Sequence, residues 1–262
     1  MNNENSYTKK ILKPTQKLQD ELFQEMKSRI KEDDTSVPYY YNEYWYMRKY
    51  EKGKDYPIYL RKYKSLDADE ELLVDVNKLA EGYSYFQLRG ISISPDNKKM
   101  AYAVDTLSRR IYTIKIKNLE TGEMYNEQIQ NTTGGSTWAN DNKTLFYSSR
   151  EDVTLRVNKI HKHQLGSDVG EDELVYEEKD KEFSTGIYKT KSNKFLVIGS
   201  GSTLTSEVRY IDADNPSEEP KLFLKRVEGH EYSIDHYKND FYIKTNINDA
   251  HNFKIMKTSI SN

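Results

Sequence analysis

The sequence contains no cysteine, only six prolines, and no apolar run long enough to cross a membrane. The absence of cysteine excludes disulfides, thiolate catalysis and cysteine metal ligands, and is typical of a reducing compartment. A bilayer-spanning helix needs about 20 consecutive apolar residues, so we expect no membrane partner. An excess of one charge is also lacking, because 40 Lys and Arg face 42 Asp and Glu. Without a basic stripe, nucleic acid is not an expected partner either.

Aromatic residues are the most abundant structural signal. The chain has 22 tyrosines and an aromatic share of 12%, against a hydrophobic share of 35%. Tyrosine suits half-buried strands, because its ring packs while its hydroxyl reaches water. At 262 residues the chain has the length of one all-β domain.

A strand–turn–strand pattern recurs four times along the chain. Its turn asparagines, Asn97, Asn142, Asn193 and Asn239, lie 45, 51 and 46 residues apart, and each turn precedes an apolar, β-prone run. Repeats of about 40–50 residues with several strands each are typical of β-propeller blades. We therefore predict an all-β fold, a partial β-propeller of about four and a half blades. The predicted blades lie near residues 37–80, 83–130, 135–180, 183–227 and 230–262.

An amphipathic helix is predicted over residues 14–31, within an N-terminal linking segment, 1–36. Leu18, Leu22 and Met26 recur every four residues on one face. We expect this face to pack on the edge of a domain. After the segment, the aromatic alternation over residues 39–50 predicts one strand.

Nucleophilic serine chemistry has no motif in this chain. The elbow G-x-S-x-G is absent: Gly134–Trp138, around Ser136, lacks the final glycine, and Gly199–Thr203, around Ser200, leads into no helical pattern. Both segments are interpreted as blade loops. We therefore predict no catalytic residue within these 262 residues.

Histidine and carboxylate groups offer weak metal or acid–base candidates. His161 and His163 share a strand face but have no third ligand at a suitable spacing, so we expect strand-end histidines. The pairs His230–Glu231 and Asp235–His236 suit acid–base chemistry or, as we expect, structural bonds. Asp212–Asn215 resembles the start of a calcium loop, but Pro216 favours a hairpin turn. No cofactor or metal is predicted.

Several longer segments resemble one family. The chain is similar, from about Glu4 to Thr258, to the N-terminal half of the oligopeptidase B (protease II) group in the prolyl oligopeptidase family of serine peptidases. The segments that carry this resemblance include Leu18–Asp34, Ser36–Tyr39, Gly53–Tyr59, Leu107–Arg110, Asn118–Gly122, Trp138–Asp141, Val175–Asp180, Thr205–Arg209 and His230–Tyr237. Their number and order make the resemblance more specific than one short motif.

The resemblance implies a seven-bladed propeller followed by an α/β-hydrolase domain with a Ser-Asp-His triad. It implies cleavage of short peptides after Arg or Lys, with the propeller restricting access to the active site. On this hypothesis the chain is a fragment, its partners are oligopeptide substrates and the hydrolase domain, and the fragment alone is inactive. Asp105, Arg109 and Arg110 are then candidates for salt bridges to that domain, the alternative being ordinary surface charge.

Two other functions stay open. The chain is alternatively a stand-alone propeller-like binding module, or the propeller of a proline-specific oligopeptidase. The charge run Glu177–Glu182 is interpreted as a solvated surface, the alternative being an acidic lining that attracts basic peptides. We expect a cytoplasmic location, or a periplasmic one if a signal precedes Met1.

Overall fold

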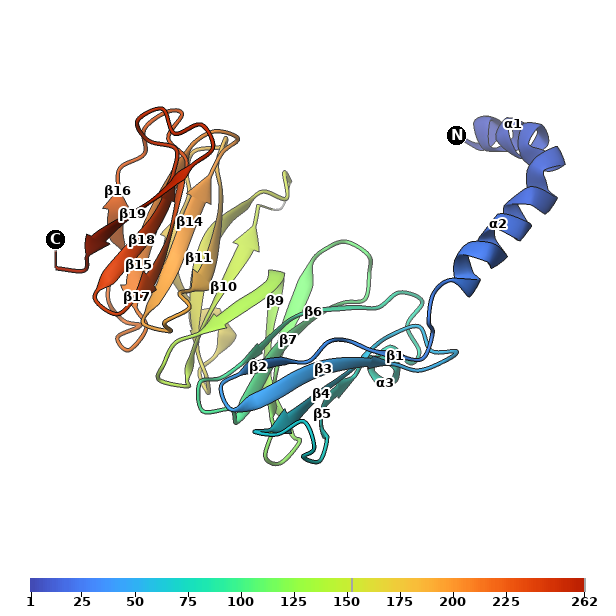
Figure 1. Ribbon diagram of the computed structural model, residues 1–262, viewed down its shortest axis with the longest axis horizontal. Helices are drawn as coiled ribbons and strands as arrows, with labels where there is room; N and C mark the ends of the chain where they lie inside the picture. Colours follow the sequence, from blue (N-terminus) through green and yellow to red (C-terminus); the bar gives the residue numbers. More distant parts are fainter. Residues whose placement is uncertain (152, 262) are drawn as a thin grey trace. The chain divides into compact units, whose positions relative to one another are not determined.

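The computed structural model describes residues 1–151 and 153–261, and the chain divides into two compact units (Figure 1). The first unit is Met1–Leu79 and the second is Ala80–Asn262. Strands dominate the second unit, whereas the first unit combines N-terminal helices with a small sheet. Within the described residues, none of the helices combines the length and the apolar character that crossing a membrane requires.

The first unit begins with helices α1 (Asn2–Leu12) and α2 (Gln16–Ser28), joined by the 3₁₀ turn η1 (Lys13–Thr15). α2 lies inside the predicted range of 14–31, whereas the sequence analysis predicted no helix at α1. The expected packing of the apolar face of α2 is not observed. Every residue of α1 and α2 is exposed, and Phe23 and Met26 expose 58% and 61% of their surface.

A small antiparallel sheet completes the first unit. Its strands are β1 (Asp34–Thr35), β2 (Tyr39–Tyr41), β3 (Tyr44–Tyr50), β4 (Ile58–Tyr63) and β5 (Glu71–Asp75), followed by α3 (Val76–Leu79). The order is β1-β3-β4-β5, and β2 also pairs with β3. The prediction of one strand over residues 39–50 is wrong. Asn42 and Glu43 have φ of 45° and 68°, which makes a tight two-residue hairpin turn between β2 and β3.

The second unit starts with a seven-stranded antiparallel sheet. Its strands are β6 (Gln87–Ile93), β7 (Lys99–Asp105), β8 (Tyr112–Asn118), β9 (Met124–Trp138), β10 (Thr144–Arg150), β11 (Val157–Gln164) and β12 (Glu173–Glu177), with the 3₁₀ turn η2 (Val169–Glu171) before β12. The boundary expected between 130 and 135 falls inside β9. This strand is antiparallel to both β8 and β10, and Asn131 and Gly134 bend it with φ of 58° and 88°. Thus β9 is shared by two four-stranded blades, β6–β9 and β9–β12.

Two further sheets follow in chain order. Blade β13–β16 contains β13 (Ser184–Lys189), β14 (Phe195–Gly201), β15 (Ser206–Asp212) and β16 (Lys221–Leu224). Blade β17–β19 contains β17 (Tyr232–Tyr237), β18 (Asp240–Thr245) and β19 (Lys254–Ser259). Each blade is a meander in which consecutive strands pair, as the repeated strand–turn–strand pattern predicts.

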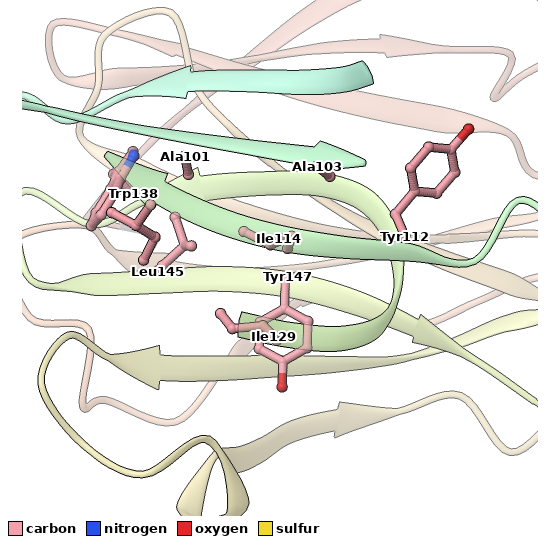
Figure 2. Close-up of a cluster of buried hydrophobic side chains, with 9 residues drawn as sticks. Ala101, Ala103, Tyr112, Ile114, Ile129, Trp138, Leu145 and Tyr147 are labelled. Atoms are coloured by element: carbon pink, nitrogen blue, oxygen red, sulfur yellow. The ribbon is translucent and has the colours of Figure 1, made fainter. Parts of the chain in front are cut away.

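Apolar side chains fill the seams between neighbouring blades. Figure 2 shows the seam between blades β6–β9 and β9–β12, where Ile114, Trp138 and Leu145 are almost fully buried. Leu196 and Phe146 fill the next seam, and the third contains Phe195 with residues of β17 and β18. The blades are held face to face by burial of these rings and aliphatic groups, each contributing about 1.5–3 kcal/mol.

The backbone conformation of the turns explains why asparagine recurs in them. Asn97, Asn142 and Asn193 have φ of 61°, 59° and 61°, the left-handed conformation that asparagine tolerates better than most residues. The fourth turn differs, because there Lys238, and not Asn239, has the positive φ, of 56°. Tyr237 and Asp240 pair directly across it, so a tight two-residue turn replaces the longer ones.

Candidate functional site

The strands of the second unit have two ends that differ in chemistry. The turn end carries the turns between the first and second strands of each blade. The crossover end carries the loops between the second and third strands and the segments that pass to the next blade. The turn end comprises residues 94–98, 139–143, 190–194 and 238–239. The crossover end comprises residues 106–111, 153–156, 178–183, 202–205, 225–231 and 246–253.

The turn end is cross-linked by hydrogen bonds between adjacent blades. The Asp96 amide donates to Asn142 Oδ1 at 2.8 Å, and the Trp138 indole donates to the Ser92 carbonyl at 3.1 Å. Later blades repeat such bonds, from Asn140 N to Ala213 O, from Tyr188 Oη to Ile234 O and from Lys191 N to Asp235 Oδ1. These contacts satisfy the polar groups of the turn end within the chain itself.

Lys189 lies within these cross-links. Its ammonium group donates to the Trp138 carbonyl at 2.9 Å and to Asn140 Oδ1 at 2.6 Å. Burial lowers the pKa of Lys189 to about 8, against the opposing effect of Asp214 and Asp141. The amine therefore joins two blades while its charged form is disfavoured.

The crossover end exposes an aliphatic side chain in each of four successive loops. Leu107 and Leu204 expose 76% and 62% of their surface, and Val153 exposes 93%. Ile247 exposes 38%. We call these four residues the aliphatic rim. Isolated exposed aliphatics are ordinary, but here one recurs in the loop between the second and third strands of each of four blades.

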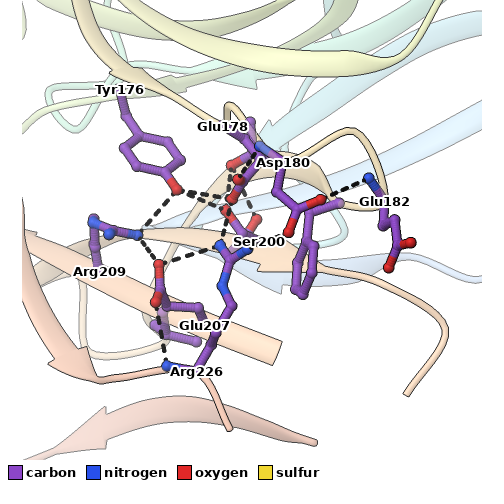
Figure 3. A network of polar contacts seen from close by, with 12 residues as sticks. Tyr176, Glu178, Asp180, Glu182, Ser200, Glu207, Arg209 and Arg226 are labelled. Atoms are coloured by element: carbon purple, nitrogen blue, oxygen red, sulfur yellow. Dashed lines mark hydrogen bonds and ion pairs between the residues drawn. The ribbon is translucent and has the colours of Figure 1, made fainter. Parts of the chain in front are cut away.

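A buried charge cluster joins blades β9–β12 and β13–β16 (Figure 3). Arg226 Nη2 donates to Glu178 Oε2 at 2.7 Å and lies 3.4 Å from Glu207 Oε1, which also accepts from Arg209. The Tyr176 hydroxyl donates to Glu178 at 2.9 Å. Glu178 and Glu207 are only 3% and 7% exposed, so their charges depend on these donors.

The contacts of the cluster favour the ionised form of the Glu178 carboxylate. Burial by itself raises the pKa of Glu178, but the bonds from Arg226, the Asp180 amide and Tyr176 outweigh it and lower that pKa. Burial likewise opposes the charge of Arg226, and the two glutamates raise its pKa. The interpretation of Glu177–Glu182 as a wholly solvated run is therefore wrong at Glu178, because tertiary packing brings an arginine 48 positions away onto it.

Asp105 ends strand β7, and Arg109 and Arg110 lie in the loop that follows it at the crossover end. The buried Asp105 carboxylate accepts the Leu107 amide and the Arg110 amide, each at 2.8 Å. It therefore braces its own loop, in which Ser108 and Arg110 have φ of 57°. Arg109 and Arg110 are exposed beside Leu107.

The serines of the two glycine-rich segments lie in strands. Ser136 is part of β9, and Ser200 is part of β14, where its hydroxyl contacts Tyr176 Oη at 3.4 Å and Thr185 Oγ1 at 3.3 Å. A nucleophile elbow needs a sharp strand-to-helix turn. Both strands instead continue the blades, so the interpretation of these segments as blade loops is wrong: strand pairing continues through Ser136 and Ser200.

The candidate histidines make structural contacts. His161 Nε2 contacts Ser149 Oγ at 3.0 Å, whereas His163 Nδ1 contacts Asp172 Oδ1 at 2.6 Å. The other two candidate pairs behave similarly, since His230 contacts Thr245 Oγ1 and His236 contacts Ser192 Oγ, each at 2.8 Å. Asp212 accepts the Asp214 amide within a hairpin turn. Over residues 1–151 and 153–261, no three acidic or histidine side chains gather as metal ligands.

Comparisons with known proteins agree with this arrangement. A family model described as the prolyl oligopeptidase N-terminal beta-propeller domain matches residues 1–262. Over 98% of its length, the chain is 37% identical to "Dipeptidyl aminopeptidase BI" of Pseudoxanthomonas mexicana and 33% identical to "Protease 2" of Moraxella lacunata. It spans only 37% and 38% of the lengths of these relatives.

Solved structures lead to the same fold. Oligopeptidase B from Leishmania major superposes with a TM-score of 0.92 at 30% identity, covering 99% of this chain and 37% of that one. Oligopeptidase B from Trypanosoma brucei gives 0.88 at 28% identity, covering 98% of this chain and 37% of that one. The β-propeller predicted from the repeats is therefore confirmed.

Proposed function

The chain belongs to the prolyl oligopeptidase family, and from this premise we propose that it is the substrate-gating propeller portion of an oligopeptidase B-like serine peptidase. The whole enzyme would hydrolyse short peptides after Arg or Lys. The propeller would admit oligopeptides to the active site and exclude folded proteins. The observation that carries this proposal is the agreement of fold and sequence with oligopeptidase B over nearly the whole chain.

The chemistry itself is assigned to an α/β-hydrolase domain outside these 262 residues. This follows because the chain contains no nucleophile elbow, and its two candidate serines lie within blade strands. The proposed docking surface for that domain is the crossover end, whose aliphatic rim suits an apolar partner. Arg109 and Arg110 would pair with its carboxylates, while Asp105 holds their loop in place.

The test is to express the whole reading frame that contains these residues and to assay fluorogenic peptides ending in Arg, Lys or Pro. We expect cleavage after Arg and Lys, no cleavage of a folded protein such as native ribonuclease, and no activity of residues 1–262 alone. A serine-reactive probe that labels the isolated 262 residues would contradict the assignment of the chemistry. Comparable cleavage of folded protein would contradict gating, and a frame that ends at codon 262 would favour a stand-alone binding module.

A second candidate is the release of dipeptides from peptide N-termini. It is favoured by the 37% identity to the relative named dipeptidyl aminopeptidase BI. The same assay separates the two functions, because a blocked N-terminus on the peptide abolishes dipeptide release and leaves endopeptidase cleavage unchanged. Preference for Pro over Arg and Lys would instead indicate a proline-specific enzyme.

A further inference from the structure

The crossover 178–183, which carries the chain from β12 to β13, is held by two arginines from different parts of the second unit. Arg156 Nη1 donates to the Asp180 carbonyl and to the Phe183 carbonyl, each at 2.7 Å. Arg226 Nη1 lies 3.4 Å from Asp180 Oδ2, and its guanidinium carbon lies 3.8 Å from the centre of the Phe183 ring. Arg156 Nη2 also lies 3.3 Å from the Glu178 carbonyl, and Arg226 pairs with the Glu178 carboxylate, so the two arginines make six contacts with this six-residue segment.

These contacts link successive blades. Arg156 comes from the loop that precedes β11, and Arg226 from the segment that follows β16. The crossover between them presents exposed Lys179 and Lys181 to solvent, while Phe183 stays buried under Arg226. Removal of the guanidinium groups would leave the Glu178 amide bonded to the Asn158 carbonyl of β11 at 2.8 Å. Residues 179–183 lie outside the strands and would lose these arginine contacts.

The contacts that Arg226 makes with the crossover 178–183 are mainly electrostatic. Arg226 is about one quarter exposed, so water and salt reach the ion pairs that it makes with Glu178, Asp180 and Glu207. Partly exposed ion pairs weaken as the ionic strength rises. The first two blades, by contrast, are joined at the turn end by neutral hydrogen bonds from the Asp96 amide and the Trp138 indole, which salt affects much less.

We propose that the crossover 178–183 is a salt-sensitive strap at the crossover end, closed while Arg156 and Arg226 hold it and opened when these contacts are lost. Opening uncovers Phe183 and loosens the seam between blades β9–β12 and β13–β16. The effect of this opening on substrate access rests on the proposed gating function. The opening itself involves only residues of this chain, so it can be measured on residues 1–262.

The experiment measures amide hydrogen exchange of the 262-residue chain by mass spectrometry. Arg226→Met keeps the aliphatic stem and removes the guanidinium group, and Lys221→Met, which removes an exposed pair with Glu218, is the matched control. We expect exchange over residues 178–183 to rise about tenfold in R226M, with residues 93–98 unchanged and K221M like the native chain. In the native chain, raising NaCl to about 1 M should produce the same local rise.

Unchanged exchange at 178–183 in R226M, or an equal rise throughout the second unit, would overturn the strap. If R226M does not fold, the salt titration of the native chain decides alone: a local rise at 178–183 supports the strap and no local rise refutes it. Neither readout uses peptidase activity. An inactive or differently specific enzyme would therefore contradict the proposed function but not the strap. Unchanged exchange at 178–183 would contradict the strap but not the proposed function.

Discussion

Contacts between neighbouring blades occur at both ends of the second unit, but the two ends use different kinds of contact. At the turn end, uncharged side chains bond to the adjacent blade, as Asn142 does to the Asp96 amide and Trp138 to the Ser92 carbonyl. At the crossover end, long arginine side chains hold buried glutamates, and aliphatic groups face solvent. The difference shows that neighbouring blades are joined by neutral hydrogen bonds at one end and by arginine–carboxylate pairs at the other.

The strongest test of this contrast compares one apolar residue from each end. Trp138 is 2% exposed, so Trp138→Ala should lower the free energy of unfolding by about 4 kcal/mol, through lost burial and a cavity. Leu204 in the aliphatic rim is 62% exposed, so Leu204→Ala should change it by less than about 0.5 kcal/mol. Urea denaturation of the two variants measures both. Similar losses would show that the crossover end is as tightly packed as the turn end.

A pH series examines the buried amine at the turn end. Lys189 has a pKa lowered to about 8, whereas an unperturbed lysine titrates near 10.5. Between these values the unfolded chain binds a proton that the folded chain has lost, so the free energy of unfolding should rise with pH. We expect a rise of about 1–2 kcal/mol, allowing for partial solvent screening, that is absent in Lys189→Met.

The control for this series is the difference between the native chain and the variant at each pH, which cancels the titration of the tyrosines. Denaturation midpoints near pH 7.5 and pH 10 are sufficient, since they lie on either side of most of the transition. A native-minus-variant difference that stays constant, or falls with pH, would show that Lys189 is solvated and does not lie in a closed seam.

The smallest effect concerns the turn backbone. Asn142 has a φ of 59° and accepts the Asp96 amide, so Asn142→Gly loses only the hydrogen bond, whereas Asn142→Ala also strains the left-handed backbone. The alanine variant should be less stable than the glycine variant by about 1 kcal/mol. Thermal unfolding of the pair measures the difference. Equal stability would mean that the turn relaxes, and that the turn end is less rigid than its cross-links indicate.

Local patterns in the sequence predicted the elements whose causes are local. Three of the four turn asparagines take the left-handed conformation, and the helix expected at 14–31 is present as α2. The tight turn at Asn42 and Glu43 was missed, because aromatic alternation continues across it and hides the break between β2 and β3. Helix α1 was also missed, since Asn2–Leu12 has few apolar residues with helical spacing.

The candidate site was less predictable, because its contacts are distant in the sequence. Arg109 and Arg110 are exposed in one loop, and their role as partners of a hydrolase domain stays a prediction. Asp105 was grouped with them, but its carboxylate points to backbone amides of its own loop. Glu178 was placed in a solvated run, and nothing near it in the sequence indicates the contact with Arg226.

The all-β repeat, the amphipathic helix, the absence of a serine elbow and the family resemblance can be read from residue types and their spacing. The end of the blades that exposes the aliphatic rim, and the place where the buried charges meet, depend on how the strands pack in three dimensions. A buried charge such as that of Glu178 is stable only beside a group of opposite charge or a hydrogen-bond donor. The group that fills this role, Arg226, is distant in the sequence and is brought to Glu178 by the packing of the blades.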